Sequence, residues 1–504
     1  MADQDFRTCS ITGLKVHLPA ANLIMANAVA AVVLLLIGGL AAAGVALTRL
    51  PSIHLLPADW FYRILTLHGL AMLIAWIIFF EMAGLYLGAS VLLNARIAAP
   101  KMAWLQFILM VVGVLLIAAM VLTGQADVMF TSYPPLKAHP LYYLGVILFA
   151  VGALIGCFVF FGTLYKARKE GTYPHGSFPL VTFGLACAAM IAIATLLHGA
   201  AIYIPTLLWS LGLMGMDESA YRLVWWALGH SSQQINVAAM ISVWYLVGTL
   251  SVGMKPISQK LCRTAFVLYV LFINVASEHH ILVDPVFSNA HKIWNTGYVM
   301  HLAVLASMIH ALAVPAGIEV ALRKKGYTSG LFEWLKKAPW SNPAFSAIML
   351  SIFGFGFMCG ITGVTFGSEQ VNITVHNTWR ITGHFHATVV FGTTLAFMGV
   401  TYYVLPLIFR REVLGMGFAK LQPWFFGIGM LLQSGGMMLA GAYGIPRRHW
   451  DIVNFGGSPF SFAWDPTAYM WLGVFGIGAL LATIGGAIYI LVTVGTILFG
   501  KKLA

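Results

Sequence analysis

The stretch that decides the fold is HNTWRITGHFHATVVFGTTLAFMGVTYYVLPLIF, residues 376–409. Two histidines, His384 and His386, stand near the start of an apolar segment that carries no Asp, Glu, Lys or Arg between Arg380 and Arg410. About 20 consecutive apolar residues suffice to cross the hydrocarbon core of a bilayer as a helix. The segment therefore predicts a membrane-spanning helix over 380–409, with two imidazoles just inside the membrane.

The composition of the whole chain is typical of a membrane protein. Of its 504 residues, 60 % are apolar and 9 % are charged, whereas a soluble domain carries about 25 % charged residues. The net charge is +12, but the basic residues lie mainly on predicted loops, so lipid is the expected partner and nucleic acid is not. The five cysteines form no CxxC pair, which argues against a covalently attached haem, a zinc knuckle or a paired-cysteine copper site.

Twelve apolar segments are long enough to span a bilayer. They predict one all-α, polytopic transmembrane bundle of about 12 helices, a single domain over residues 1–504. The predicted spans are 22–47, 61–92, 102–123, 141–165, 178–206, 220–252, 263–286, 293–322, 344–366, 380–409, 423–443 and 468–498. The first is interpreted as a span and not as a cleaved signal peptide, because a small-residue cleavage pattern is absent.

The basic residues also predict the orientation. Most of the 28 Lys and Arg residues lie on the N-terminus, the C-terminus and every second loop. Cytoplasmic loops are enriched in Lys and Arg. We therefore expect an integral protein of a bacterial or archaeal plasma membrane, with both termini cytoplasmic.

Six intramembrane histidines from four predicted spans converge on one layer in the outer part of the membrane: His68, His230, His279, His280, His384 and His386. A single buried histidine is more often a packed, hydrogen-bonded side chain than a ligand. Six at one depth favour metal binding, because polar groups at membrane depth are costly unless they are paired or ligated.

The spacing of these histidines restricts what they can share. His384 and His386 are about 200° apart around a helix, so they cannot bind the same ion, and two cofactors flanking one helix are expected. His279 and His280, if helical, are about 100° apart. They can bind one metal ion only together with a third ligand that faces them.

Several segments resemble motifs of the haem-copper oxidase superfamily, in that family's order. They are Leu67-His68-Gly69, Gly229-His230, His279-His280 with Asp284-Pro285, the segment from His376 to His386, and Gly444-Ile-Pro446-Arg447-Arg448. The tripeptide His-Asn-Thr that begins at His376 most resembles the sequence of the B-type branch. The resemblance covers essentially the whole chain and implies subunit I, the catalytic subunit of a terminal reductase.

The resemblance implies two haems. It assigns His68 and His386 to the two axial positions of a low-spin haem, which makes that iron an electron relay. It assigns His384 to the single axial position of a high-spin haem. One axial imidazole leaves the iron a coordination site for a diatomic gas.

The resemblance also implies one copper ion, held by three histidines: His230, His279 and His280. Imidazole suits copper, and three neutral ligands leave it an open position. Arg447 and Arg448 would pair with haem propionates, with His376 beside them. Their loop lies on the predicted outer side, where positive charge is disfavoured, so anionic propionates explain it better than an ordinary basic loop does.

The sixth predicted span departs from the family's pattern. Most oxygen-reducing members read His-Pro-Glu-Val-Tyr or a close variant there, and the tyrosine is bonded covalently to the histidine. This chain reads His230-Ser-Ser-Gln-Gln234. Because a residue four positions further lies one turn along the same face of a helix, we expect Gln234 to reach the site in place of the tyrosine.

This substitution favours the reduction of nitric oxide to nitrous oxide. Cleavage of the oxygen–oxygen bond takes four electrons, and the resemblance implies that the tyrosine supplies one of them. Coupling two nitric oxide molecules takes only two electrons, and glutamine cannot be oxidised in this way. With no obvious carboxylate ligand, copper is favoured over non-haem iron.

The alternative is B-type, cytochrome c oxidase-like reduction of oxygen to water, with or without proton pumping. It requires a tyrosine, or another oxidisable residue such as Trp225 or Trp226, from elsewhere in the chain. Tyr269 stands ten residues before His279, about three helical turns away, and is predicted to lie too far from the site.

Three residues are candidates for a proton route: Tyr245, Ser307 and Glu81. Tyr245 lies on the cytoplasmic side of His230, where similar B-type members have a channel tyrosine, and Ser307 on the eighth span is placed to join it. Such residues in membrane helices more often serve packing. Glu81 is an intramembrane carboxyl, a functional candidate by default, but a solvated residue at a helix end is the competing interpretation.

Two other classes of protein explain the histidines less well. A transporter would be expected to show repeats, broken helices and midplane polar residues. A simple haem electron carrier would need one histidine pair and would leave the other histidines unexplained. For a reductase of a small gas we expect a second subunit that carries or docks the electron donor, a cytochrome c or cupredoxin-like domain.

Overall fold

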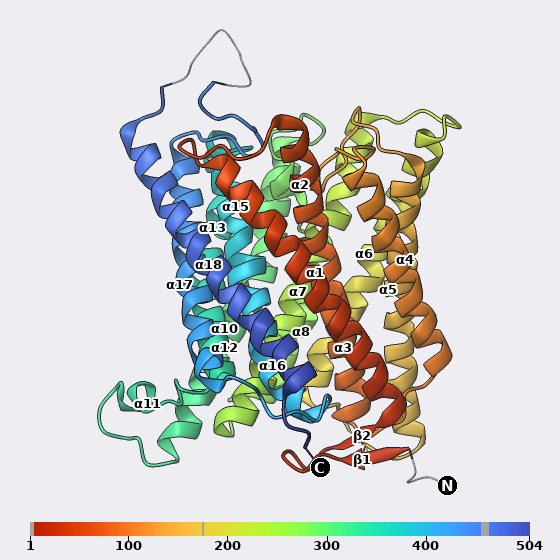
Figure 1. The fold of residues 1–504 in the computed structure, drawn as a ribbon, viewed down its shortest axis with the longest axis vertical. Helices are drawn as coiled ribbons and strands as arrows, with labels where there is room; N and C mark the ends of the chain where they lie inside the picture. Colours follow the sequence, from red (N-terminus) through yellow and green to blue (C-terminus); the bar gives the residue numbers. More distant parts are fainter. Residues whose placement is uncertain (1–4, 174–175, 455–462, 504) are drawn as a thin grey trace.

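The fold is a bundle of helices that stand side by side (Figure 1). The computed structural model describes residues 5–173, 176–454 and 463–503. Two short strands, β1 (Phe6–Thr8) and β2 (Lys15–His17), pair antiparallel near the N-terminus. The predicted all-α transmembrane fold is confirmed.

Eleven helical runs in the described residues are long and apolar enough to cross a bilayer. Seven are uninterrupted: α1 (Leu18–Arg49), α4 (Pro100–Leu122), α5 (Pro140–Lys169), α6 (Leu180–Ser210), α7 (Glu218–Val252), α17 (Met416–Ala442) and α18 (Pro466–Phe499).

Four runs contain π-helical turns, which are often found at functional sites. They are α2 (Ala58–Leu70) with η1 (Ala71–Ala75), α3 (Trp76–Tyr86) and η2 (Leu87–Val91); α9 (Asn289–Ile293) with η4 (Trp294–Val299) and α10 (Met300–Arg323); α12 (Pro343–Phe353) with η5 (Gly354–Cys359) and α13 (Gly360–Phe366); and α15 (Trp379–His386) with η6 (Ala387–Thr394) and α16 (Leu395–Leu407). The remaining helical pieces are α8 (Gln259–Phe272), η3 (Glu278–His280), α11 (Glu333–Lys336) and α14 (Glu369–Val375).

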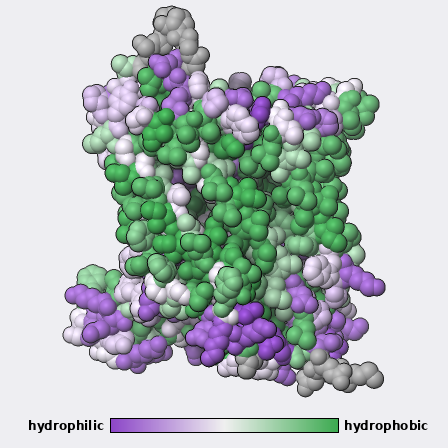
Figure 2. Space-filling model, in the orientation of Figure 1, coloured by the Kyte–Doolittle hydropathy of each residue, from purple (hydrophilic) through white to green (hydrophobic). Residues whose placement is uncertain are grey.

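Apolar side chains form a belt around the middle of the bundle, and polar side chains gather at its two ends (Figure 2). Leu115, Leu197 and Leu491 are more than half exposed on the outer surfaces of their helices. Lipid tails accommodate such side chains, and the protein is an integral membrane protein. Both termini lie at the same end of the bundle (Figure 1), and the assignment of that end to the cytoplasm stays a prediction.

The predicted seventh span, residues 263–286, is wrong as a continuous helix. α8 has 14 residues and ends at Phe272. The chain then runs through turns to the short 3-10 helix η3. His279 and His280 therefore do not occupy neighbouring positions of an α-helix, and the 100° separation expected between them does not apply.

Side-chain amides hold the backbone that follows α8. Asn295 Nδ2 donates to the carbonyl of Val275 at 2.8 Å, and Asn372 Nδ2 donates to the carbonyl of His279 at 2.9 Å. Non-helical backbone at membrane depth is tolerated where its polar groups are satisfied within the protein. The two amides bond carbonyls that no longer have a partner within a helix, so the helix can end before His279 and His280.

The segment 376–409 forms the centre of the bundle. The run Trp379–Leu407 is the most enclosed of the eleven candidate spans. α15 packs against α17, and η6 packs against η5. His384 and His386, at the end of α15, therefore lie in the interior.

Glycines bring α17 and α18 close together. A Cβ atom added at Gly436 would lie 2.6 Å from the backbone nitrogen of Phe475, and one added at Gly478 would meet the backbone nitrogen of Gln433. Small residues let membrane helices approach until their backbones are in contact. This contact supports α17, which in turn packs against α15.

We expect Gly478→Ala to destabilise the protein, because the added methyl group displaces the backbone of α17. Overpacking of this kind costs about 1–3 kcal/mol, which is measured as a lower midpoint of thermal unfolding in detergent by circular dichroism. Gly473→Ala is the matched control on α18, since a Cβ atom there meets nothing within 4 Å. Equal effects of the two substitutions would contradict the packing described.

Candidate metal and cofactor site

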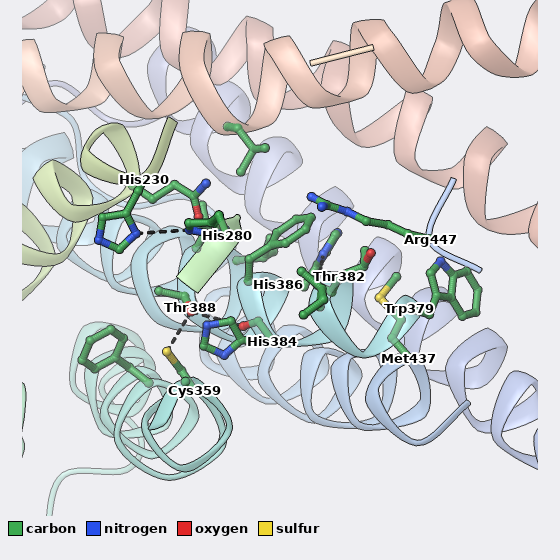
Figure 3. A pocket seen from close by; sticks show the side chains of 18 of the residues that line it. His230, His280, Cys359, Trp379, Thr382, His384, His386, Thr388, Met437 and Arg447 are labelled. Atoms are coloured by element: carbon green, nitrogen blue, oxygen red, sulfur yellow. Dashed lines mark hydrogen bonds between the residues drawn. The ribbon is translucent and has the colours of Figure 1, made fainter. Parts of the chain in front are cut away.

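A cavity of about 620 Å³ lies between the central helices. All six histidines singled out in the sequence line it: His68, His230, His279, His280, His384 and His386. Figure 3 shows His230 and His280 at one end, Arg447 and Trp379 at the other, and His384 and His386 between them. Packing therefore brings four separate segments of the chain to one site.

His68 on α2 faces His386 on α15. The two rings are nearly parallel, with 6.3 Å between centroids and an interplanar angle of 22°. The Nδ1 atom of His68 lies 3.1 Å from the carbonyl of Gly38, and that of His386 lies 2.8 Å from the carbonyl of Thr382. Ligating histidines commonly donate one ring N–H to a carbonyl, which leaves both Nε2 atoms free for one iron. The pair fits a haem with two axial imidazoles.

His384 points toward a different neighbour. Its Nδ1 lies 2.9 Å from the hydroxyl oxygen of Thr362 on α13, whereas His386 faces α2. A Cβ atom added at Gly363 would lie 3.0 Å from His384 Cε1, so glycine gives the ring its room. His384 offers one ligand nitrogen on its own side of α15, which fits an iron with a single axial imidazole.

Three histidines form a potential metal site. The ligand atoms of His230, His279 and His280 all lie within 4.8 Å of one another, and His230 Nδ1 is 3.2 Å from His280 Nε2 (Figure 3). The Trp226 ring stacks on His280 with 3.8 Å between centroids. This set contains imidazoles alone, a donor set that suits copper.

Glu278 directly precedes the His279-His280 pair and carries a carboxyl group next to these histidines. It is not predicted from the sequence as a site residue. Its Oε1 lies 2.7 Å from His291 Nε2, and it does not join the three-histidine group.

Cationic side chains occupy the other end of the cavity. Arg447 and Arg448 line it, and no Asp or Glu is among the described residues that do so. Burial and then the charge of Arg448 lower the pKa of Arg447 to about 9. Buried charges are costly without a counter-charge, so this end fits the anionic propionates of haem. His376 does not line the cavity; burial and then the charge of Arg447 lower its pKa to about 4.

Arg49 is a third arginine at this end and is not predicted from the sequence. It is buried, its two terminal nitrogens each donate at 2.6 Å to the carbonyls of Pro446 and His449, and its guanidinium lies 4.4 Å from the centre of the Trp379 ring. A signal that could have found it is its position at the end of an otherwise apolar predicted span, at the same end of the bundle as Arg447.

The candidates Tyr245 and Ser307 belong to one buried polar cluster. The Tyr245 hydroxyl lies 3.0 Å from His310 Nδ1, and the Tyr269 hydroxyl lies 2.7 Å from the Ser307 hydroxyl. The rings of Tyr269 and His310 are 5.9 Å apart. Ser307 lines the cavity, whereas Tyr269 does not. His310, three residues after Ser307, is not predicted from the sequence.

Glu81 lies inside the bundle and is 5 % exposed. The interpretation of this residue as a solvated helix end is therefore wrong. Gln234 lines the large cavity together with His230, as expected for a residue one helical turn further along α7.

Comparisons with known proteins agree with this arrangement. The family model described as "Cytochrome C and Quinol oxidase polypeptide I" matches residues 22–488. Cytochrome c oxidase subunit 1 of Thermus thermophilus is 30 % identical over 399 residues, 77 % of this chain and 69 % of the relative. Ubiquinol oxidase subunit 1 of Acetobacter aceti is 24 % identical over 462 residues, 85 % of this chain and 62 % of the relative. A cryo-EM structure of a haem-copper terminal oxidase dimer has a TM-score of 0.89 and 26 % identity, covering 96 % of this chain and 85 % of that chain.

The facing rings of His68 and His386 generate a prediction. His68→Ala and His386→Ala should each abolish the low-spin haem absorbance, because each removes one of two axial ligands. His384→Ala should spare much of that absorbance and remove carbon monoxide binding. Optical spectra of the reduced protein, with and without carbon monoxide, measure both effects.

His198→Ala is the control, because His198 bonds the carbonyl of Ala194 within α6 and does not line the cavity. Loss of only the low-spin spectrum in His384→Ala would reverse the assignment of the two histidines on α15.

Proposed function

Because the chain belongs to the cytochrome c and quinol oxidase polypeptide I family, we propose that it is the catalytic subunit of a haem-copper terminal reductase that converts nitric oxide to nitrous oxide. The family is one of membrane oxidoreductases that bind haem and copper. The finer proposal places the chain in the B-type branch, as a variant with glutamine in place of the cross-linked tyrosine.

The observation that carries the proposal is the identity of residue 234. Gln234 lines the cavity with His230, and no tyrosine is among the described residues that line it. The amide of glutamine donates and accepts hydrogen bonds but does not supply an electron. Two nitric oxide molecules, two electrons and two protons give nitrous oxide and water, so this reaction needs no oxidisable side chain.

The histidines would hold three cofactors. We propose that His68 and His386 hold a low-spin haem, that His384 holds a high-spin haem, and that copper is bound by the remaining set: His230, His279 and His280. When bound, these metals supply the gas-binding positions and the electrons. The protein's part is to orient the imidazoles of His68, His384 and His386, each of which has one ring nitrogen held by a carbonyl or a hydroxyl.

The other residues of the site supply charge and protons. Arg447, Arg448 and the neighbouring His376 are proposed to bind the propionates. The polar cluster of Tyr245, His310, Tyr269 and Ser307 lies between α7, α8 and α10. It contains two hydrogen-bonded pairs, Tyr245 with His310 and Tyr269 with Ser307, and such hydroxyl and imidazole groups can give and take protons. It supports the proposed proton route through Tyr245 and Ser307.

Electrons must reach the site from another protein. All five cysteines are buried and free, and none forms the paired motif of an additional copper site. We propose a second subunit that carries or docks the donor, a cytochrome c or cupredoxin-like domain.

Reduction of oxygen to water is the second candidate, and two observations favour it. The relatives are named as cytochrome c and ubiquinol oxidases. In addition, Trp226 stacks on His280, where its indole is placed to supply the fourth electron that Gln234 cannot.

Anaerobic turnover of the purified holoenzyme with nitric oxide, set against oxygen uptake by the same preparation, separates the two candidates. We expect nitrous oxide formation and little oxygen uptake, and only a weak gain of oxygen reduction in Gln234→Tyr. A turnover number for oxygen of about 10–1,000 per second, with full conversion to water, would contradict the nitric oxide proposal. Trp226→Phe would then abolish that activity if Trp226 is the electron source.

Metal analysis checks the three-histidine site. Because this set contains no carboxylate, we expect one copper and two haem irons per chain, and loss of copper with both haems retained in His279→Ala. Three irons and no copper in active protein would contradict the assignment.

A further inference from the structure

Glu81 is an isolated carboxyl in the interior of the bundle. It lies midway along α3 and takes part in none of the ion pairs found among the described residues. The titratable group that shares a cavity with it is Cys157, which is also buried. A carboxylate with no cation beside it is very costly in apolar surroundings. Burial therefore favours the neutral, protonated form of Glu81.

Asn236 joins Glu81 to the helix that carries the three-histidine site. With its amide oriented so that both contacts are satisfied, Asn236 Nδ2 lies 3.0 Å from Glu81 Oε1 and 3.2 Å from the carbonyl of Ser232. Asn236 is 1 % exposed and follows Gln234 by two residues on α7. The amide thus bridges the carboxyl and the helical turn that includes His230 and Gln234.

Glu81 also lines two small cavities. One, of about 30 Å³, lies among α3, α5, α6 and α7. The other, of about 40 Å³, lies among α1, α3, α6, α7 and α16. Each exceeds the roughly 10–15 Å³ that one water molecule requires. Their walls are mostly apolar, and in the second cavity the carboxyl of Glu81 and the hydroxyl of Ser242 are the polar side-chain groups that a water molecule would meet.

The second cavity points toward the end of the bundle where the termini lie. Its wall follows the helix from Phe80 to Leu92 and includes Val404 near the end of α16. At 1.5 Å per residue this stretch of helix covers roughly 18 Å. η2, which continues α3, packs against β2, near the end of the bundle where the termini lie (Figure 1). The carboxyl thus stands between this cavity and the Asn236 bridge.

We propose that Glu81 supplies protons for reduction of the gas at the metal site and is reprotonated from the end of the bundle that holds the termini, by way of the second cavity. The neutral carboxyl gives one proton, through water, to the reduced gas, and the resulting carboxylate takes one proton from water in the second cavity; no electron passes through it. Asn236 is a positioning residue that holds the carboxyl toward α7. This route is separate from the Tyr245–Ser307 cluster.

The proposal rests on the proposed function only in that a gas is reduced with uptake of protons, which holds for nitric oxide and for oxygen. The test therefore uses whichever gas the wild-type holoenzyme reduces. If the protein reduces oxygen and not nitric oxide, the assay uses oxygen, and the role of Glu81 is tested by the same measurement.

The experiment compares Glu81→Gln, Glu81→Asp and Asn236→Leu with wild type. A placed proton-transfer group contributes about 100-fold or more, so Glu81→Gln should lower turnover by that order and slow proton uptake during reoxidation, followed with a pH indicator dye. Carbon monoxide recombination, which needs no proton, should be unchanged. Glu81→Asp should restore part of the rate, and Asn236→Leu should slow proton uptake without loss of either haem.

Met82→Leu is the matched control, because Met82 is the next residue on α3 and lines the first cavity. The exchange of methionine for leucine keeps the side-chain volume nearly unchanged. Wild-type turnover and proton uptake in Glu81→Gln would overturn the proposal. If Glu81→Gln does not retain its haems, the infrared difference between reduced and oxidised wild type, with the glutamate carboxyl isotopically labelled, replaces it. A carboxyl band that changes on reduction and shifts in Asn236→Leu supports the proposal, and the absence of any such change defeats it.

Discussion

The arrangement of this protein depends on the cost of placing imidazole at membrane depth. Six histidines line one interior cavity, where each polar nitrogen must be hydrogen-bonded or ligated. The structure meets this demand in two ways. Backbone carbonyls and a threonine hydroxyl hold one nitrogen of His68, His384 and His386, and the free nitrogens converge where metals would bind. The helices that carry these histidines must therefore lie at fixed distances from one another.

The same constraint explains why the chain gives up helical structure before His279. A continuous helix through 263–286 would place His279 and His280 on different faces. The structure ends α8 early and satisfies the freed carbonyls with the amides of Asn295 and Asn372. These two asparagines come from segments on either side of α10–α13, so the three-histidine site depends on the packing of several helices and not on one motif.

Two features of the site bear on the proposed reaction. Gln234 lines the large cavity together with His230, and Glu81 is a carboxyl deep in the bundle that the large cavity does not include. Both bear on the supply of electrons and protons more than on the binding of metals. We therefore propose that this chain keeps the cofactor set of its family while its substrate and its proton supply differ.

The sequence alone predicted eleven of the twelve proposed membrane spans as the structure has them, together with the angular relation of side chains on one helix. His384 and His386 diverge, and Gln234 follows His230 into the cavity, because helical periodicity determines these directions locally. Only the tertiary structure decided what each side chain meets: the 3-10 turn at His279, the pairing of Glu278 with His291, the place of Arg49 beside Trp379, and the Glu81–Asn236 bridge. These contacts join residues on separate helices, and their geometry follows from packing between helices, which local periodicity does not encode.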